Sequence, residues 1–205
     1  MIEAVYNFDW KVFEWISAHL WCRFLDVFTA VISITGEGGA IWIAVAVAFL
    51  FFKKTRKTGI MMGAALLVML LINDNILKPL IARPRPWDYG PWQGIFVYPG
   101  KAFTEQHSFS FPSGHTSSSV TAAVILLIYN KKIGVPAMCY AFLMGFSRVY
   151  LFDHYCTDVL AAFVVGIIYA LIGYLITTLV YNLIERKKKA KAEAAETADA
   201  AEAKA

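Results

Sequence analysis

The chain has 205 residues, of which 59% are hydrophobic and only 17% are charged. Soluble domains carry about 45–50% apolar and about 25% charged residues, so this composition excludes an ordinary soluble domain. The net charge of +4 comes from short basic clusters between apolar runs, which is not the pattern of a nucleic-acid-binding surface. Collection of the apolar residues into runs indicates a membrane protein with several spans.

Residues 3–21 mix charged side chains with apolar ones at nearly helical spacing, and they include Trp10, Trp15 and Trp21. Amphipathic helices rich in tryptophan lie in the membrane interface, so this segment is predicted to form an interfacial helix. A polar first transmembrane helix is the alternative. The spread of charges over residues 1–23 also argues against a secretory signal peptide, whose core is an uninterrupted apolar run.

Residues 24–52 form an apolar segment that is longer than one span and is broken by the glycines at 36–39. Since a spanning helix needs about 20 residues, we expect an interfacial piece over 25–35, a glycine bend, and then a span built around 40–52. The remaining apolar runs predict further spans over 60–77, 116–129, 133–151 and 159–184. The predicted fold class is therefore all-α, a polytopic membrane helix bundle with five transmembrane helices, or six if the N-terminal helix also crosses.

Basic clusters at 53–57, 131–132 and 186–189 fall in alternate loops, which places all three on the cytoplasmic side. The membrane-embedded domain is then residues 1–184, and residues 185–205 form a cytoplasmic tail of basic residues, alanine and glutamate. The other loops are external, and they contain the polar segments 78–85, 112–115 and 148–158. We expect these polar segments to meet at the outer face of the cell membrane. Aromatic residues in the loop 87–111 suit the headgroup zone, where they either anchor the loop or gate the access of lipids.

Charged side chains at bilayer depth cost about 2.5–3.5 kcal/mol on insertion scales, so their retention indicates a function. The external segments hold six such residues, which are Lys78, Arg85, His115, Arg148, His154 and Asp158. Five of the six can be cationic, and phosphate is the natural anion to balance them. The prolines of Arg83-Pro84-Arg85-Pro86 restrict the backbone around both arginines, and either could be the ligand.

Pro112-Ser113-Gly114-His115 precedes a helix rich in hydroxyl side chains. Ser113 can cap that helix, and Gly114 allows a ligand to approach the backbone closely. The backbone N–H groups at a helix start form an anion site, although an ordinary helix start gives the same pattern. A hydrolase dyad of Ser113 and His115 is a further alternative, but no nucleophile-elbow motif accompanies it.

His154 and Asp158 are four residues apart, so on a helix the carboxylate can reach the imidazole, orient it and stabilise its protonated form. Such an imidazole is a competent nucleophile toward phosphorus. A shared metal ion is the rival interpretation, but Lys78, Arg85 and Arg148 would repel it. No metal ion or other cofactor is therefore expected, and the isolated cysteines match no zinc pattern.

Lys78-x6-Arg85-Pro86, Pro112-Ser113-Gly114-His115 and Ser147-Arg148-x5-His154-x3-Asp158 resemble the three signature motifs of the type-2 phosphatidic acid phosphatase superfamily. Members are integral membrane lipid phosphatases, and they share their fold with vanadium haloperoxidases. The resemblance covers roughly residues 24–184 and implies a haloperoxidase-like core. In size and layout the chain is similar to small bacterial members, including undecaprenyl diphosphate phosphatases. Larger members have an extra first span, which leaves five or six crossings open here.

The resemblance also implies a metal-independent reaction in two steps. His154 attacks phosphorus and forms a phosphohistidine, Asp158 holds His154, and His115 protonates the leaving oxygen and then activates water. The phosphate-binding set is implied to be Lys78, Arg85, Ser113, Gly114 and Arg148, and the preference for Arg85 over Arg83 rests on this motif.

The expected function is hydrolysis of a lipid phosphate or diphosphate at the external leaflet, with undecaprenyl diphosphate as the preferred substrate. Phosphatidic acid and phosphatidylglycerol phosphate remain alternatives, and a lipid or anion transporter is the alternative from another class. The expected partners are the lipid substrate and the surrounding membrane lipids, without nucleic acid. The oligomeric state is left open.

Overall fold

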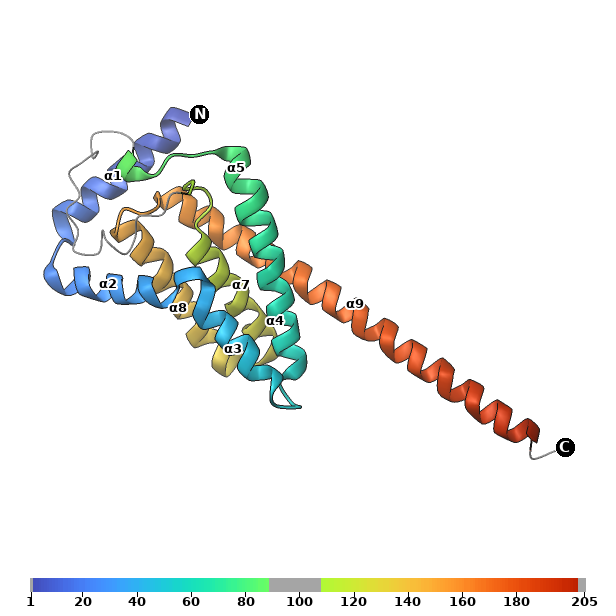
Figure 1. Cartoon of the computed structure of the whole chain (residues 1–205). Coiled ribbons are helices and arrows are strands. Elements are labelled where there is room, and N and C mark those ends of the chain that lie inside the picture. The colour runs from blue at the N-terminus through green and yellow to red at the C-terminus, as the bar shows by residue number, and fades with distance from the viewer. Residues whose placement is uncertain (1, 89–107, 203–205) are drawn as a thin grey trace.

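The structure, a computed structural model, describes residues 2–88 and 108–202, with side chains for 3–87 and 108–194. Every regular element in those ranges is helical, as the sequence predicted (Figure 1). The helices are α1 (Ile2–His19), α2 (Arg23–Thr35), α3 (Ala40–Leu50), α4 (Arg56–Met69), α5 (Lys78–Ile81), α7 (Gly114–Tyr129), α8 (Lys131–Tyr150) and α9 (Cys156–Glu202). Shorter elements are η1 (Glu37–Gly39), the π-helical η2 (Leu70–Leu77) and η3 (Pro86–Asp88).

Three stretches of helix in the described ranges are long and apolar enough to cross a bilayer. They are Arg56–Ile81 with 26 residues, Lys131–Tyr150 with 20 and Cys156–Ala194 with 39. The pair formed by α2 and the segment Glu37–Leu50, bent by 40°, brings the number to four if it is one span. The remaining predicted span, α7, has 16 residues. At 1.5 Å per residue it is about 24 Å long, less than the ~30 Å of the hydrocarbon core.

The predicted glycine bend lies between α2 and α3. Gly38 and Gly39 have φ angles of 56° and 68°, in the left-handed region that favours glycine because it has no Cβ. The helix therefore breaks after Thr35 and resumes at Ala40. This break places Glu37 at the end of the bundle where the polar segments gather.

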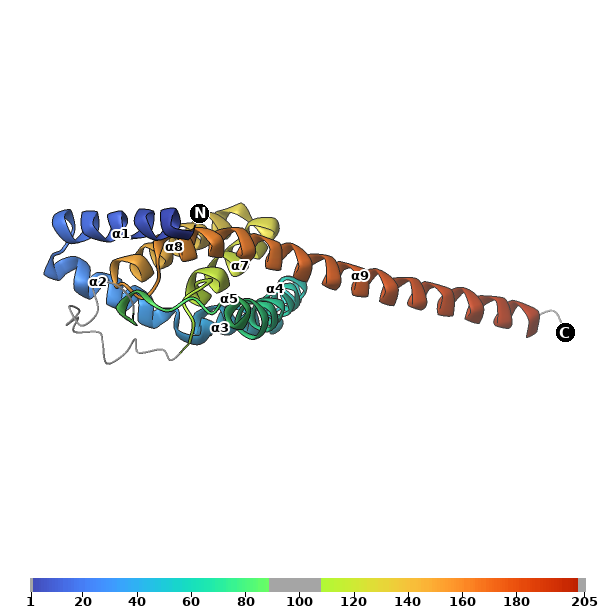
Figure 2. The same ribbon diagram turned by 90° about the horizontal axis from the view of Figure 1, so that it is seen from above.

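Helix α7 is the central element of the bundle. Figure 2 shows it between α8 on one side and α3 and α4 on the other. Its buried side chains include Val120 and Ile125, which belong to an apolar core shared with α3, α4, α8 and α9. Other core members are Trp42, Met62, Ala65, Ala141 and Ala170. Burial of α7 on all sides fixes its first residues, Gly114 and His115, firmly within the polar end.

Helix α1 packs against the junction between α8 and α9 through a second apolar cluster. Phe13 stacks on Phe152 with ring centroids 4.3 Å apart, and it also contacts Tyr155 at 5.8 Å. The other face of α1 exposes large apolar residues such as Phe8 and Trp15. Helix α1 therefore carries apolar residues on both its packed and its exposed faces, and its position at the membrane interface stays a prediction.

Helix α9 continues through the segment that was predicted to be a tail without a packing pattern. It has 47 residues and projects beyond the bundle in both views (Figures 1 and 2). Alanine, glutamate and lysine are strong helix formers, so the helix persists although the side chains of residues 185–194 are exposed. An i,i+4 ion pair of 4.0 Å between Lys189 and Glu193 adds slight support.

The three polar segments lie at the same end of the bundle. Figure 1 shows α5, the start of α7 and the start of α9 at one end, with the turn between α3 and α4 at the other. The basic residues 53–57 occupy that turn, and 131–132 begin α8 beside the end of α7.

Candidate active site

Backbone breaks place the polar segments at one end of the bundle. Helix α5 stops at Ala82, whose φ is 47°, and the two prolines that follow cannot continue a helix. Asn130 begins α8 at the opposite end, and that helix runs through Arg148 to Tyr150. The turn 151–155 then carries His154 to the start of α9, where Asp158 lies in the first turn.

His154 is fully buried in the turn between α8 and α9. Its Nδ1 lies 3.7 Å from Asp158 Oδ2, which is an ion-pair distance and too long for a hydrogen bond. The hydroxyl of Ser110 lies between them: it is 3.4 Å from Nδ1 and donates to Asp158 Oδ2. The sequence predicted direct contact of the carboxylate with the ring. The structure instead shows a serine bridge, which no motif had indicated.

Asp158 is held by several donors besides Ser110. Its Oδ2 accepts a hydrogen bond of 3.0 Å from the backbone N–H of Tyr155, and Oδ1 accepts one of 2.5 Å from Arg83 Nη1. The carboxylate is therefore fixed on both oxygens. Burial, followed by the positive charges of Arg85, Arg148 and Lys78, lowers the pKa of His154 well below 6.5. The imidazole is consequently neutral at neutral pH, as a nucleophile must be.

Arg83 is engaged on the far side of Asp158, away from the predicted phosphate ligands. Its Nη2 donates to Asp9 Oδ2 at 2.7 Å, and its guanidinium lies 3.9 Å from the ring centroid of Tyr155. Asp9 also accepts hydrogen bonds from the backbone N–H of Thr157 at 2.9 Å and from its hydroxyl at 2.6 Å. This network ties α1 to the start of α9. Because Arg83 is held by Asp9 and Asp158, Arg85 is the arginine nearer the other predicted phosphate-binding residues.

We expect Asp9→Ala to lower the free energy of unfolding by roughly 2–3 kcal/mol, because a buried arginine loses one of its two carboxylates. The rate of the reaction expected from the sequence should also fall, since Arg83 is then free to pull Asp158 from its position. Thermal unfolding in detergent measures the first effect. Glu14→Ala, which removes an exposed carboxylate from the same helix, is the matched control. Equal stability of the two variants would contradict a structural role for the Asp9 network.

Arg85 and Arg148 are both buried and both approach Asp153. Arg85 donates to the backbone carbonyl of Asp153 at 3.1 Å and to that of Ser108 at 2.7 Å. Arg148 Nη2 lies 2.6 Å from Asp153 Oδ2, and its Nη1 donates to the hydroxyl of Ser33 on α2. The two guanidinium groups are thus oriented by residues from three segments of the chain, next to His154.

His115, at the start of α7, faces the glycine break between α2 and α3. Its Nε2 lies 3.3 Å from Glu37 Oε2. A Cβ on Gly36 would lie 3.2 Å from His115 Cδ2 and 2.3 Å from Met144 Cε, so a larger residue there would require the Met144 side chain to move. The break therefore supplies an acidic partner for His115 that sequence reasoning did not identify.

Lys78 lies over the N-terminus of α7. Its Nζ is 2.7 Å from Asp74 Oδ1, and a Cβ on Gly114 would be 3.6 Å from the same ammonium. Ser113 occupies the N-cap position, but its side chain makes no cap hydrogen bond and instead lies 3.0 Å from the Thr116 hydroxyl. The predicted capping by the Ser113 side chain is therefore wrong, which leaves the N–H groups of the first turn available to a ligand.

The charge balance of the site differs from that expected from sequence. The sequence analysis counted one anion, Asp158, among five potential cations. The structure adds Glu37, Asp74 and Asp153 as ion-pair partners of His115, Lys78 and Arg148. Three of the five potential cations therefore each have a carboxylate partner of their own.

All eight residues predicted for catalysis or phosphate binding lie at one end of the bundle, within this network. They are Lys78, Arg85, Ser113, Gly114, His115, Arg148, His154 and Asp158. Ser110, Arg83, Asp9, Glu37 and Asp153 complete it, and no sequence pattern had singled out their contacts. In the described part of the chain no three His, Cys, Asp or Glu side chains form a group that could hold a metal ion. Of the aromatic loop 87–111, residues 89–107 lie outside the described residues.

Comparison with known proteins identifies relatives for both the sequence and the fold. An undecaprenyl-diphosphatase of Sulfolobus acidocaldarius is 31% identical over 128 residues, which cover 62% of this chain and 58% of that relative. This chain therefore spans little more than half the length of that protein. The crystal structure of Aquifex aeolicus LpxE superposes with a TM-score of 0.66 at 26% identity, covering 80% of this chain and 93% of LpxE.

A second crystal structure is that of the first transmembrane PAP2 type phosphatidylglycerolphosphate phosphatase from Bacillus subtilis. Its TM-score is 0.66 at 25% identity, and the alignment covers 86% of this chain and 88% of that one. The model of the PAP2 superfamily matches residues 57–183, more than half of the chain and a range that contains all three motifs. The chain therefore belongs to the PAP2 superfamily.

Proposed function

We propose that the chain is an integral membrane lipid phosphatase that hydrolyses a lipid phosphate or diphosphate through a phosphohistidine intermediate. The observation that carries this proposal is the orientation of His154. Its Nδ1 faces Ser110 and Asp158, so Nε2 is the nitrogen left for attack, and Lys78, Arg85 and Arg148 are close enough to affect its charge. A neutral imidazole beside a cationic cradle is suited to attack on phosphorus.

In the first step, Nε2 of His154 forms a bond to phosphorus as the bond between phosphorus and the lipid oxygen breaks. His115 donates a proton to that departing oxygen. In the second step, His115 accepts a proton from water, the hydroxide attacks phosphorus, and the bond between phosphorus and nitrogen breaks. Glu37, 3.3 Å from His115 Nε2, carries a negative charge that offsets part of the effect of burial and of Arg148, both of which disfavour the protonated ring.

Phosphoryl oxygens would be held by Lys78, Arg85 and Arg148, with the Ser113 hydroxyl and the Gly114 N–H completing the cradle. Support comes from the burial of Arg85, Arg148 and Ser113 and from the start of α7, whose N–H groups are not capped by a side chain. Asp158 and Ser110 position the nucleophile. The cations supply the charge stabilisation that a metal ion would otherwise give, so the proposed reaction is metal-independent.

For the membrane arrangement, we propose five crossings with α1 at the interface, the site on the external face and the C-terminus in the cytoplasm. The positive-inside rule supports this orientation, because the basic clusters lie at the end opposite the site. We count α7 as a crossing although it is shorter than the hydrocarbon core, because it lies at the centre of the bundle and neighbouring helices surround it.

Undecaprenyl diphosphate is the preferred substrate, supported by the name of the Sulfolobus acidocaldarius relative. The name of the Bacillus subtilis structure keeps phosphatidylglycerol phosphate as an alternative, and phosphatidic acid remains another. The shared chemistry is a terminal phosphoryl group on a lipid, because every group in the cradle addresses phosphate oxygens.

A phosphate-release assay in detergent with EDTA tests the function and ranks the substrates. We expect release from undecaprenyl diphosphate to be fastest, with slower release from phosphatidic acid and phosphatidylglycerol phosphate. Phosphatidylcholine, a phosphodiester, is the control that should release none. Absence of release from every lipid, with uptake of labelled lipid or anion into proteoliposomes, would identify a transporter instead. Strict dependence on added metal would contradict the mechanism.

A further inference from the structure

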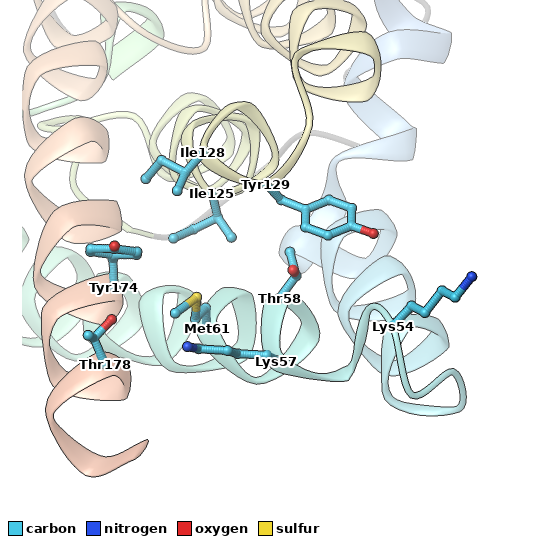
Figure 3. Close-up of a pocket in the computed structure, with 9 residues that line it drawn as sticks. All are labelled: Lys54, Lys57, Thr58, Met61, Ile125, Ile128, Tyr129, Tyr174 and Thr178. Carbon is cyan, nitrogen blue, oxygen red and sulfur yellow. The ribbon is translucent and has the colours of Figure 1, made fainter. Parts of the chain in front are cut away.

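A cavity of about 290 Å³ lies at the end of the bundle opposite the candidate active site. Figure 3 shows that most of its lining residues come from α4, α7 and α9. One wall is apolar and consists of Met61, Ile125 and Ile128. The rest of the lining includes two lysines and the hydroxyl groups of threonines and tyrosines. The cavity therefore combines apolar and polar surface, as the binding site of an amphiphile does.

The charge of this cavity is positive. Lys57 lies in the first turn of α4, where the N-cap residue Thr55 makes no side-chain cap and the helix dipole is positive. Figure 3 shows the Lys57 side chain directed toward α9, and its Nζ lies 5.2 Å from the ring centroid of Tyr181. Lys54, in the preceding turn, also lines the cavity, and Figure 3 shows its side chain on the other side of Thr58, directed away from Lys57. No acidic side chain is among the described residues that line the cavity.

Thr178 provides a separate indication of a ligand. Its Oγ1 is buried and has no hydrogen-bond partner among the described residues. The hydroxyl of the neighbouring Thr177 donates to the Gly173 carbonyl at 2.8 Å, the usual arrangement for threonine in a helix. A buried hydroxyl without a partner costs about 1–3 kcal/mol, so an oxygen of a bound molecule would be stabilising at this position.

We propose that this cavity binds the headgroup phosphate of an anionic phospholipid from the leaflet opposite the candidate active site. Lys57 and the start of α4 would contact the phosphate, and Thr178 would donate to a headgroup oxygen. Basic pockets between transmembrane helices are a known mode of recognition for such headgroups. The volume is at the lower end of the ~300–1,000 Å³ of ligand pockets, so the headgroup enters and the acyl chains follow the apolar wall into the bilayer.

The site is independent of the proposed phosphatase reaction. A phospholipid with a phosphodiester headgroup lacks the terminal phosphoryl group that the cradle around His154 would act on. Because such a lipid contacts α4, α7 and α9 together and binds only the folded chain, it stabilises the bundle at the end far from the site.

Native mass spectrometry of the full chain in neutral detergent tests the proposal with phosphatidylglycerol as the probe. We expect one tightly retained phosphatidylglycerol and at least about tenfold weaker retention of zwitterionic phosphatidylcholine. Lys57→Gln should weaken the retention of phosphatidylglycerol about tenfold. The matched control is Lys53→Gln, which removes an exposed lysine from the turn between α3 and α4. Lys53 does not line the cavity, so this change should alter retention less than about twofold.

Thr178→Leu is a second variant, which keeps every charge but fills the cavity and removes the hydroxyl. It should also weaken retention about tenfold. Equal losses in Lys53→Gln and Lys57→Gln would show diffuse charge attraction and overturn the proposal. Full retention in Thr178→Leu would overturn it as well. Displacement of the lipid by glycerol phosphate at equal concentration would show that the site takes a free phosphate and no lipid.

Discussion

His154→Ala is expected to abolish phosphate release, with a loss of at least about 10⁴-fold in turnover, because the variant has no nitrogen to attack phosphorus. Binding of the lipid should persist, since Lys78, Arg85 and Arg148 remain in place. The chain should also fold, because the side chain removed makes only long polar contacts, 3.4 Å with Ser110 and 3.7 Å with Asp158. The measurement is phosphate release from the best substrate of the lipid panel.

Rapid quenching with ³²P-labelled substrate extends this test to the intermediate. The wild-type chain should carry an acid-labile, base-stable phosphoryl group, as phosphohistidine does, and His154→Ala should carry none. His19→Ala is the control, because that histidine is exposed at the end of α1, where its Nδ1 lies 2.9 Å from the Trp15 carbonyl oxygen. A labelled, active His154→Ala protein would place the nucleophile elsewhere.

Asp158→Asn should lower kcat by about 10³-fold while the KM for the lipid changes little. In the wild-type chain both carboxylate oxygens accept hydrogen bonds, one from Arg83 and the other from Ser110 and the Tyr155 N–H. An asparagine amide must present its NH₂ group to one of these donors, so two donors face each other and the side chain moves. Ser110 then loses its position, and His154 loses the orientation of its ring.

The separation of kcat from KM distinguishes this positioning role from general damage. Asp26→Asn is the control, because that carboxylate accepts a hydrogen bond of 2.7 Å from the Tyr150 hydroxyl, in a different part of the fold. Thermal unfolding shows whether each variant is folded at the temperature of the assay. A loss of activity that merely follows the unfolded fraction, or a large rise in KM with unchanged kcat, would contradict the proposed role.

The sequence was sufficient to predict which segments gather but not how their side chains pair. Alternating loops and basic clusters placed 78–85, 112–115 and 148–158 on one face, and the structure brings them to one end of the bundle. Arg83 and Arg85 could not be told apart from charge or proline spacing. Their roles diverge because Asp9 and Asp158 bind one of them, and Asp9 comes from a helix 74 residues earlier in the chain.

Helix type and position followed well from apolar periodicity, whereas lengths and ends did not. The glycines at 36–39 predicted the bend between α2 and α3, because left-handed φ angles favour that residue type. The extension of α9 through residues 185–202 was missed, since that segment has no apolar face and only its intrinsic helix propensity reveals it. Ser110 has no pattern around it, and its place between His154 and Asp158 depends on tertiary packing alone.

The ion pairs that line the cradle have a thermodynamic consequence for turnover under the proposed function. Asp74 and Asp153 already neutralise Lys78 and Arg148, so an arriving phosphoryl group takes part in an exchange reaction, displacing one carboxylate from each cation. The net affinity is then the difference between two ion pairings, which is much smaller than the full attraction of buried charges. When inorganic phosphate leaves, the same carboxylates can form their ion pairs with these cations again. Under the proposed function, this exchange would keep the product from being bound too tightly to be released.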